Sequence, residues 1–145
     1  RVVLYATCFV NYNSPSIGTA ARHLTIATGV LTALSHTSHT YLTEDNAVTV
    51  GTVSVTVTEF NSDATTTNVT DAAQSGLTTL VNGDIVLVSL AGTITVNEAV
   101  SANGSGNILL SAGGAGSDLD LNANVTSGTG HITLKAAETS SPSTF

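Results

Sequence analysis

Apolar and polar positions alternate along the chain from about residue 46 onward. Thr or Ser separates successive valines, and the alternation shifts its phase once, at Gly51. The valines of this pattern are Val48, Val50, Val53, Val55 and Val57. A period of two predicts a strand with one buried face, and a glycine at the phase shift indicates a bulge or bend. Residues 61–64 are interpreted as a turn, and residues 65–76 as a polar connector.

A longer period is present in the second half of the chain. Three nearly identical phrases each place an isoleucine two residues after a glycine; they occupy residues 83–87, 106–110 and 130–134. Ile85, Ile108 and Ile132 therefore follow one another at steps of 23 and 24 residues. Periods of this length are typical of β-solenoids, in which one unit cannot bury its apolar face alone and stacked units bury a continuous one.

A second alignment, at a constant offset of 25 residues, indicates two short strands in each unit. It matches Ile94, Val96, Asn97 and Val100 with Leu119, Leu121, Asn122 and Val125. Asn97 and Asn122 fall at equivalent turns, where their amides can form a hydrogen-bonded ladder. We therefore predict an all-β protein with a short parallel β-solenoid over residues 46–137. The alternative is an antiparallel β-sandwich, which also has turns at regular intervals.

The segment before residue 46 has a different pattern. Residues 2–10 are continuously apolar, which suits a buried strand, and residues 11–16 form a turn. Apolar residues at helical spacing predict a helix over residues 17–28, closed by Gly29; they are Ile17, Ala20, Ala21, Leu24 and Ala27. These patterns divide the chain into an N-terminal segment of irregular or α/β fold (1–45), a β-repeat domain (46–137) and a polar tail (138–145).

The composition agrees with a stacked β-protein and excludes several partners. Only 9% of the residues are charged and 4% are aromatic, and a mean hydropathy of +0.30 is too high for a disordered chain. The net charge is −7, and the three basic residues are Arg1, Arg22 and Lys135. They cannot form a basic face for nucleic acid or for an anionic membrane. Because no apolar run is long enough to span a bilayer, we expect no membrane insertion.

Stretches rich in Thr, Asn and Gly recur at residues 65–75, 92–96, 101–108 and 122–128. On these stretches, residues 46–137 resemble the tandem repeats of large bacterial surface proteins, the adhesin and haemagglutinin-like exoproteins. Proteins of that class are secreted and extended, and they serve in surface attachment or cell–cell contact. The resemblance therefore implies an extracellular or cell-surface location and a structural or adhesive role.

The N-terminal stretch at residues 2–18 runs from an apolar segment through Cys8 to a segment of Asn, Ser and Pro. On this stretch, residues 1–30 resemble the opening of the cysteine-rich domain of iron–sulfur oxidoreductases, in which a strand ending in Cys leads to a helix. Further cysteines complete the cluster in that family, whereas Cys8 is the only cysteine of this chain. A cluster held by thiolates needs several, so the cluster chemistry is not carried over.

Asp118 and Asp120 follow a glycine-rich turn that nearly matches the calcium-binding nonapeptide of parallel β-rolls. That motif has an apolar residue where Asp120 stands, and calcium takes six to eight oxygen ligands. Asp118 and Asp120 are therefore candidate calcium ligands, and a glycine turn followed by a strand is the other interpretation. His36 and His39 fall short of the ligand number of a zinc site and are interpreted as part of a solvated loop.

Three asparagines fit the acceptor pattern for N-glycosylation: Asn68, Asn103 and Asn124. His131 takes the place of Asp84 and Asn107 in the repeat and is interpreted as a turn-edge residue. Solenoid enzymes gather carboxylates or basic residues on one strand face, and Lys135 is the only basic residue after Arg22. We therefore expect a protein that is not an enzyme and has no catalytic residue.

The sequence thus predicts an extracellular structural protein. It would bind itself head to tail as the subunit of a filament, or serve as a surface adhesin repeat that contacts a cell-surface glycan or protein. Open terminal rungs expose unpaired backbone groups and normally have caps, and the Ser- and Pro-containing tail supplies no apolar cap. The alternative is a carbohydrate- or calcium-binding β-module on the face of Asp118 and Asp120, with calcium as the one possible cofactor.

Overall fold

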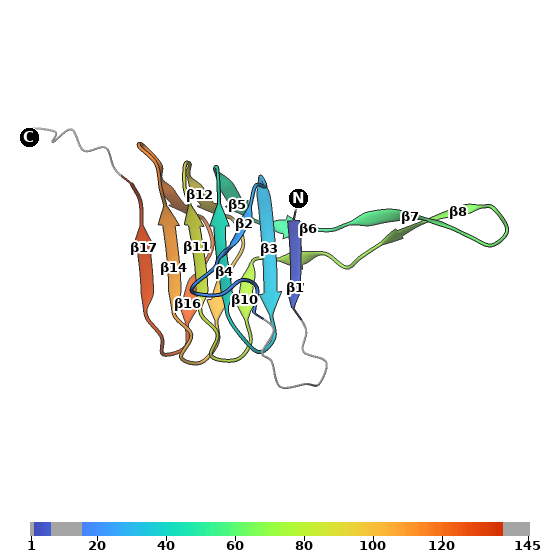
Figure 1. Cartoon of the computed structure of the whole chain (residues 1–145). Coiled ribbons are helices and arrows are strands. Elements are labelled where there is room, and N and C mark those ends of the chain that lie inside the picture. The colour runs from blue at the N-terminus through green and yellow to red at the C-terminus, as the bar shows by residue number, and fades with distance from the viewer. Residues whose placement is uncertain (1, 7–15, 138–145) are drawn as a thin grey trace, which may run out of the picture.

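The structure is a computed structural model that describes residues 2–6 and 16–137, and every regular element in these ranges is a β-strand. The strands of the two main sheets run parallel, which confirms the predicted all-β parallel solenoid over the antiparallel sandwich. Figure 1 shows the strands side by side as successive rungs, with a long hairpin projecting from them. Within the described residues, no helix has the length and apolar character needed to cross a membrane. Cys8, most of the turn predicted at residues 11–16 and the tail at 138–145 lie outside the described residues.

Two parallel sheets form the body of the protein. The strand order in the first sheet is β15 (Leu119–Leu121), β12 (Ile94–Val96), β5 (Val48–Val50), β3 (Val30–Ser35), β10 (Leu77–Thr79), β13 (Val100–Ala102) and β16 (Val125–Ser127). In addition, β1 (Val2–Ala6) pairs with β3. In the second, the order is β17 (Ile132–Lys135), β14 (Ile108–Ala112), β11 (Ile85–Ser89), β4 (Thr40–Glu44) and β2 (Leu24–Ile26). One rung therefore takes three strands, such as β10, β11 and β12, and β13, β14 and β15 stack on them as the next rung.

The isoleucine phrases occupy the same position in successive rungs. Ile85 pairs with Ile108, and Ile108 pairs with Ile132, in the register of β11, β14 and β17. Every second side chain of β11 and β14 is buried, so Ile and Leu fill the interior while Val86 and Leu109 lie on the outer face. The predicted repeat is confirmed, and the pairing of β12 with β15 and of β13 with β16 confirms the offset of 25 residues.

Glycine begins each phrase because the neighbouring rung leaves no room for a side chain. A Cβ on Gly106 would collide with the backbone carbonyl oxygen of Gly83, and a Cβ on Gly130 would collide with that of Gly106. At another corner, the Nδ2 of Asn122 donates a hydrogen bond of 2.9 Å to the Oδ1 of Asn97, which confirms the predicted ladder. Close backbone contact and side-chain hydrogen bonds therefore hold the corners of the stack, in addition to the strand pairing.

The segment before residue 46 continues the solenoid. β3 pairs with β10 and β4 pairs with β11, so Leu42 stands beside Leu87 in the core. The helix predicted over residues 17–28 is wrong, because this stretch supplies β2 on the edge of β4 and isolated bridges between Ile17 and Thr40 and between Thr19 and Arg22. The stretch is rich in β-branched Thr and Ile, and the edge of β4 offers it backbone partners, so pairing overrides the helical spacing. The α/β interpretation is corrected to all-β over the described residues.

The Glu44 side chain occupies a core position in the rung that contains β4. Glu44 is fully buried and stands where Ser89 and Ala112 stand in the next two rungs. Its two oxygens accept hydrogen bonds of 3.1 and 3.0 Å from the Thr28 N–H, and Oε1 accepts one of 3.4 Å from the Asn46 N–H. Backbone donors thus satisfy the buried Glu44 side-chain oxygens and tie the turn between β2 and β3 to the end of β4.

A hairpin interrupts the solenoid between β5 and β10. The strands β6 (Thr52–Val53) and β9 (Gln74–Ser75) form its antiparallel base, and β7 (Thr56–Phe60) and β8 (Thr66–Thr70) form the projecting part in Figure 1. The predicted one-sided burial is confirmed for Val48, Val50 and Val53, but it is wrong for Val55 and Val57, which are exposed. The interpretation of residues 65–76 as a connector is also wrong, since they supply β8 and β9. We call residues 54–73 the arm.

Candidate functional site

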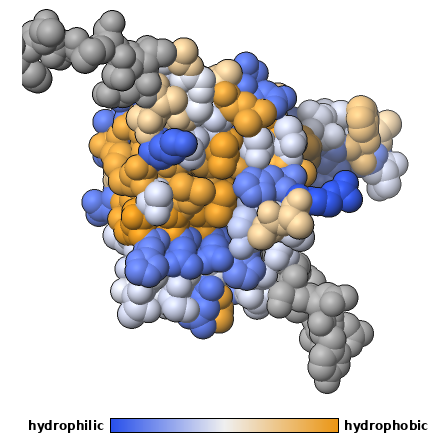
Figure 2. All heavy atoms as spheres, turned by 60° about the vertical axis from the view of Figure 1, so that its left-hand side comes forward, coloured by the Kyte–Doolittle hydropathy of each residue, from blue (hydrophilic) through white to orange (hydrophobic). Residues whose placement is uncertain are grey.

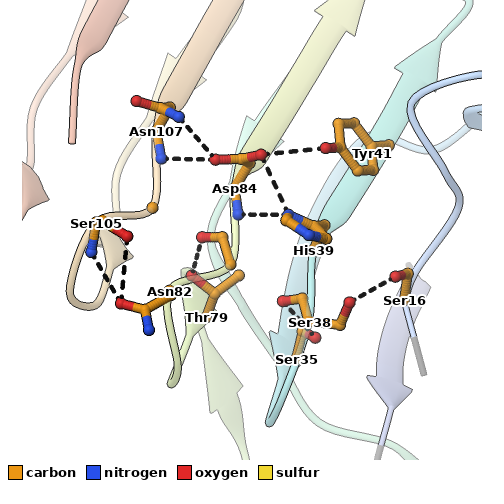
Figure 3. A network of polar contacts seen from close by, with 12 residues as sticks. Ser16, Ser35, Ser38, His39, Tyr41, Thr79, Asn82, Asp84, Ser105 and Asn107 are labelled. Atoms are coloured by element: carbon orange, nitrogen blue, oxygen red, sulfur yellow. Dashed lines mark hydrogen bonds and ion pairs between the residues drawn. The ribbon is translucent and has the colours of Figure 1, made fainter. Parts of the chain in front are cut away.

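A polar side chain precedes each strand of the second sheet from β4 to β17. The four residues are His39, Asp84, Asn107 and His131, and the strand register stacks them at one corner of the solenoid. Asp84 Oδ1 accepts hydrogen bonds from the backbone N–H (2.8 Å) and the side-chain Nδ2 (3.0 Å) of Asn107. Asn107 Oδ1 accepts one of 2.9 Å from the His131 N–H. We call these four residues the polar row, and Figure 3 shows its part around Asp84.

Tyr41 and His39 close the other side of the Asp84 carboxylate (Figure 3). The Tyr41 hydroxyl donates to Asp84 Oδ2 over 3.2 Å, and the Asp84 N–H donates to His39 Nδ1 over 2.9 Å. His39 Nδ1 also lies 3.2 Å from Asp84 Oδ2, so this carboxylate oxygen lies close to both the Tyr41 hydroxyl and the imidazole ring.

This network shifts two pKa values in opposite directions. Partial burial raises the pKa of Asp84, but hydrogen bonds from Asn107 and Tyr41 and the nearby His39 outweigh it, so the pKa lies below the ordinary value. Burial raises the pKa of Tyr41, and the adjoining Asp84 raises it further. Asp84 is therefore an anion at neutral pH, and Tyr41 is a protonated donor.

A shallow groove of about 460 Å³ lies beside the polar row. The residues that line it are Asp84, Val86, Asn107, Ile108, Leu109, His131 and Thr133. Apolar side chains and a set of carboxylate, amide and imidazole groups thus line one groove, a combination that suits the apolar face and the hydroxyl groups of a sugar ring. The Asp84 oxygens already accept three hydrogen bonds within the protein, so this carboxylate is held as an acceptor in the network.

The C-terminal end of the solenoid is uncovered among the described residues. β15, β16 and β17 are the outermost strands of their sheets, so no described strand pairs with their outer backbone groups. Leu134 and Ile132 are 44% and 42% exposed, whereas Leu110 and Ile108, one rung earlier, are 0% and 1% exposed. Figure 2, in which this side of the molecule comes forward, shows apolar side chains gathered into a broad patch.

The two candidate calcium ligands lie at this end of the solenoid. Asp120 lies in β15 and Asp118 directly before it, and both are exposed. The Asp118 N–H donates to the Thr93 Oγ1 over 3.2 Å, which ties the strand to the previous rung. In the part of the chain that the structure describes, no three or more His, Cys, Asp or Glu side chains gather in a way that could hold a metal ion. Calcium binding at Asp118 and Asp120 stays a prediction.

All three candidate glycosylation residues are exposed. Asn68 lies on the arm, where its Oδ1 accepts a hydrogen bond of 3.0 Å from Thr58, and the Nδ2 of Asn103 donates one of 2.8 Å to the Leu80 carbonyl oxygen. Asn124 lies between β15 and β16, at a corner of the solenoid. A glycan on Asn103 would compete with its hydrogen bond between rungs, and glycosylation at all three residues stays a prediction.

Sequence reasoning placed only part of the polar row. It put His131 in the position of Asp84 and Asn107, which the register confirms, but it did not connect His39 and Tyr41 with them. The arm lengthens the offset from His39 to Asp84 to 45 residues, so a search at the shorter period misses the match. An alignment of the residues from His39 onward with those from Asp84 onward, allowing one insertion, would have found it.

No protein-family model, curated protein or solved structure matches this chain. The geometry of the open end and of the polar row is therefore the basis for a functional proposal.

Proposed function

We propose that this chain is a non-enzymatic, extracellular structural protein that assembles end to end through its last rung, as a filament subunit or as a surface adhesin repeat. The observation that carries this proposal is the exposure of Leu134, Ile132 and Leu121, whose counterparts one rung earlier are buried. Full burial of such a side chain contributes about 1.5–3 kcal/mol. A further β-layer on this end would therefore be stabilised by the same contacts that hold the inner rungs together.

The backbone of the last rung favours a β-layer as the covering element. Edge strands of monomeric proteins are commonly blocked by charges, Pro or bulges. β17 contains one charged residue, Lys135, and no Pro. An added parallel strand would pair with its outer N–H and C=O groups and place apolar side chains against Leu134 and Ile132.

The opposite end of the second sheet offers a matching strand. β2 is the strand at that edge, and its Leu24 is exposed while Ile26 is half-buried. All strands of this sheet run in one direction, so β2 of one copy can stack on β17 of the next without a reversal. Repetition of such a head-to-tail contact does not close on itself and generates a fibre.

The test compares Leu134→Asp with Leu90→Asp. Leu90 is also exposed, but it lies directly after β11 and outside the last rung. We expect the wild-type chain and Leu90→Asp to form fibres in negative-stain electron microscopy, and Leu134→Asp to stay dispersed because a charge in the contact is costly to bury. A wild-type chain that remains a dispersed monomer in light scattering at high concentration contradicts the proposal.

Carbohydrate binding is a second candidate, supported by the groove beside the polar row. No Lys or Arg lines this groove and Asp84 is anionic there, so a neutral sugar fits it better than an acidic one. Titration calorimetry with neutral oligosaccharides tests this candidate. Leu109→Thr should weaken binding, Ser101→Ala on the other sheet should not, and no heat with any sugar at millimolar concentration counts against it.

A further inference from the structure

We propose that the arm, residues 54–73, is a binding element that receives an extended, basic segment of a partner protein on a valine-bearing face. Every residue of β7 and β8 is exposed, and Phe60 is 81% exposed. Figure 1 shows the arm projecting away from the rungs. A two-stranded hairpin alone is marginally stable in water, and a third strand or another surface stabilises it. The arm therefore has an open surface that a partner would stabilise.

The base of the arm is fixed to the solenoid. Val53 is buried beneath it, and the Gly76 N–H donates a hydrogen bond of 3.1 Å to the Gly51 carbonyl oxygen. The Gly76 carbonyl oxygen in turn accepts a hydrogen bond of 2.8 Å from the buried Thr32 hydroxyl. This arrangement holds the direction in which the arm leaves the body, so its faces are presented in a defined orientation.

One face of the arm combines valines with carboxylates. Val57 lies opposite Val69 in the register of β7 and β8, and the Asp71 N–H donates to the Val55 carbonyl oxygen over 2.9 Å, which sets those two residues opposite each other. Because side chains alternate between the faces of a strand, Val55, Val57 and Val69 share one face with Glu59 and Asp71. Val57 and Val69 lie between Glu59 and Asp71, and Val55 lies beside Asp71.

The other face of the arm already has partners of its own. The Thr56 and Thr70 hydroxyls lie 2.7 Å apart, and the Thr58 hydroxyl donates to Asn68 Oδ1 over 3.0 Å. These pairs satisfy the Thr56, Thr58 and Thr70 hydroxyls without any further molecule. On the valine face, the side-chain hydrogen bonds of the described residues lie near the tip, where Asn61 Nδ2 donates to the Thr65 and Thr67 hydroxyl oxygens over 2.9 Å each, so the surface around the valines is the part that a partner would cover.

Charge and spacing identify the chemistry of the partner. The arm contains three acidic residues, Glu59, Asp63 and Asp71, and no Lys or Arg. Asp71 stands opposite Val55, so the two carboxylates of the valine face are separated along the arm by the length of four extended residues, about 13 Å. An extended segment with a central valine and a Lys two residues to each side has the same spacing. A second copy of the arm would bring like charges together, which opposes self-pairing.

The experiment uses two fluorescein-labelled peptides, Thr-Lys-Thr-Val-Thr-Lys-Thr and Thr-Glu-Thr-Val-Thr-Glu-Thr, titrated with the full chain and followed by fluorescence anisotropy. We expect the Lys peptide to bind about tenfold more tightly than the Glu peptide. The double variant Glu59→Lys/Asp71→Lys should reverse this preference. The control Asp45→Lys/Val81→Lys/Leu90→Lys makes the same change in net charge at exposed positions outside the arm and should retain it.

Further variants separate the arm from the rest of the molecule. Val57→Thr/Val69→Thr should weaken binding of the Lys peptide, while Leu134→Asp, which tests end-to-end assembly, should leave it unchanged. Equal affinity for the two peptides, no measurable binding at millimolar concentration, or loss of the preference in the control overturns the proposal. A dimer that is lost in Val57→Thr/Val69→Thr would assign the face to a second copy and would also overturn it.

Discussion

The same alternation of valine and threonine has two different results in neighbouring parts of this chain. In β5, Val48 and Val50 are buried because β3 and β12 pair with it on its two sides and the rest of the rung closes over them. In the arm, Val55 and Val57 continue the alternation, but only β8 lies beside β7 and the valines are exposed. Alternation therefore determines which face of a strand is apolar, whereas burial depends on the rungs that stack against it.

The largest expected effect comes from a cavity inside the stack. Leu87 is fully buried between Leu42 and Leu110, so Leu87→Ala should lower the free energy of unfolding by about 2–5 kcal/mol. Val57→Ala on the arm should change it by less than about 0.5 kcal/mol, because the side chain is exposed. Urea unfolding followed by circular dichroism measures both. Similar losses for the two variants would mean that the arm is buried in solution.

The contrast between the stacked rungs and the arm also explains how much of the fold could be predicted from the sequence. The repeat at Ile85, Ile108 and Ile132 was visible because these rungs follow one another without insertion and keep Ile at the same inward position. The rung of β4 was missed for two reasons. The arm breaks the period, and Thr40 and Glu44 fill core positions that are Ile and Ser in β11.

The candidate site was predictable only in part for a related physical reason. Asp84 and Asn107 are neighbours through the repeat itself, whereas Tyr41 reaches Asp84 from a rung separated by the arm. The exposure of Leu134 could not be read from its phrase, which has the same pattern as the buried phrases before it. Whether a rung is inner or terminal is a property of the stack, and the local sequence does not contain it.

A second variant pair tests whether contact between rungs, rather than the residue type, determines the cost of a substitution. A Cβ on Gly106 would meet the Gly83 carbonyl oxygen, so Gly106→Ala should destabilise the protein by about 1–3 kcal/mol. Gly29 has nothing within 4 Å of the same added atom, so Gly29→Ala should be nearly neutral. Thermal unfolding measures both variants. Equal shifts of the melting temperature in the two variants would show that the corners of the solenoid are less closely packed than their backbone contacts imply.

Asp84 should have a smaller effect on the free energy of unfolding, and this effect depends on pH. The pKa of Asp84 is lowered in the folded protein, so its contribution is present above the unfolded pKa of about 3.9 and is lost as the pH falls through the folded pKa. Asp84→Asn should destabilise the protein by about 1 kcal/mol at pH 7, and the difference from wild type should shrink below about pH 4.

The arm supplies the matched control for this carboxylate. The pKa of Asp63 is also lowered, by hydrogen bonds from the Thr65 hydroxyl and N–H, but this carboxylate is fully exposed at the tip. Asp63→Asn should therefore leave the unfolding midpoint nearly unchanged from pH 3 to pH 7. A pH-dependent loss as large as that of Asp84→Asn would contradict the distinction between the polar row and the arm.

Removal of the arm should have the smallest effect on stability. β6 and β9 already pair Val53 with Gln74, so an Asn-Gly turn can replace residues 54–73 and close a two-residue hairpin. The free energy of unfolding should stay within about 1 kcal/mol of wild type, because the deletion removes no buried side chain and shortens a loop. Urea unfolding measures the change, and the variant should no longer bind the Lys peptide.

This outcome follows from how a solenoid determines its register. Each rung contacts only its neighbours, so β4 pairs with β11 through contacts such as Leu42 with Leu87, whatever length of chain connects the two strands. An insertion at a corner therefore leaves the stack intact and adds a surface outside it. If excision instead abolished cooperative unfolding, the arm would belong to the folding unit, and its exposed valines would have to be explained by contacts with the body.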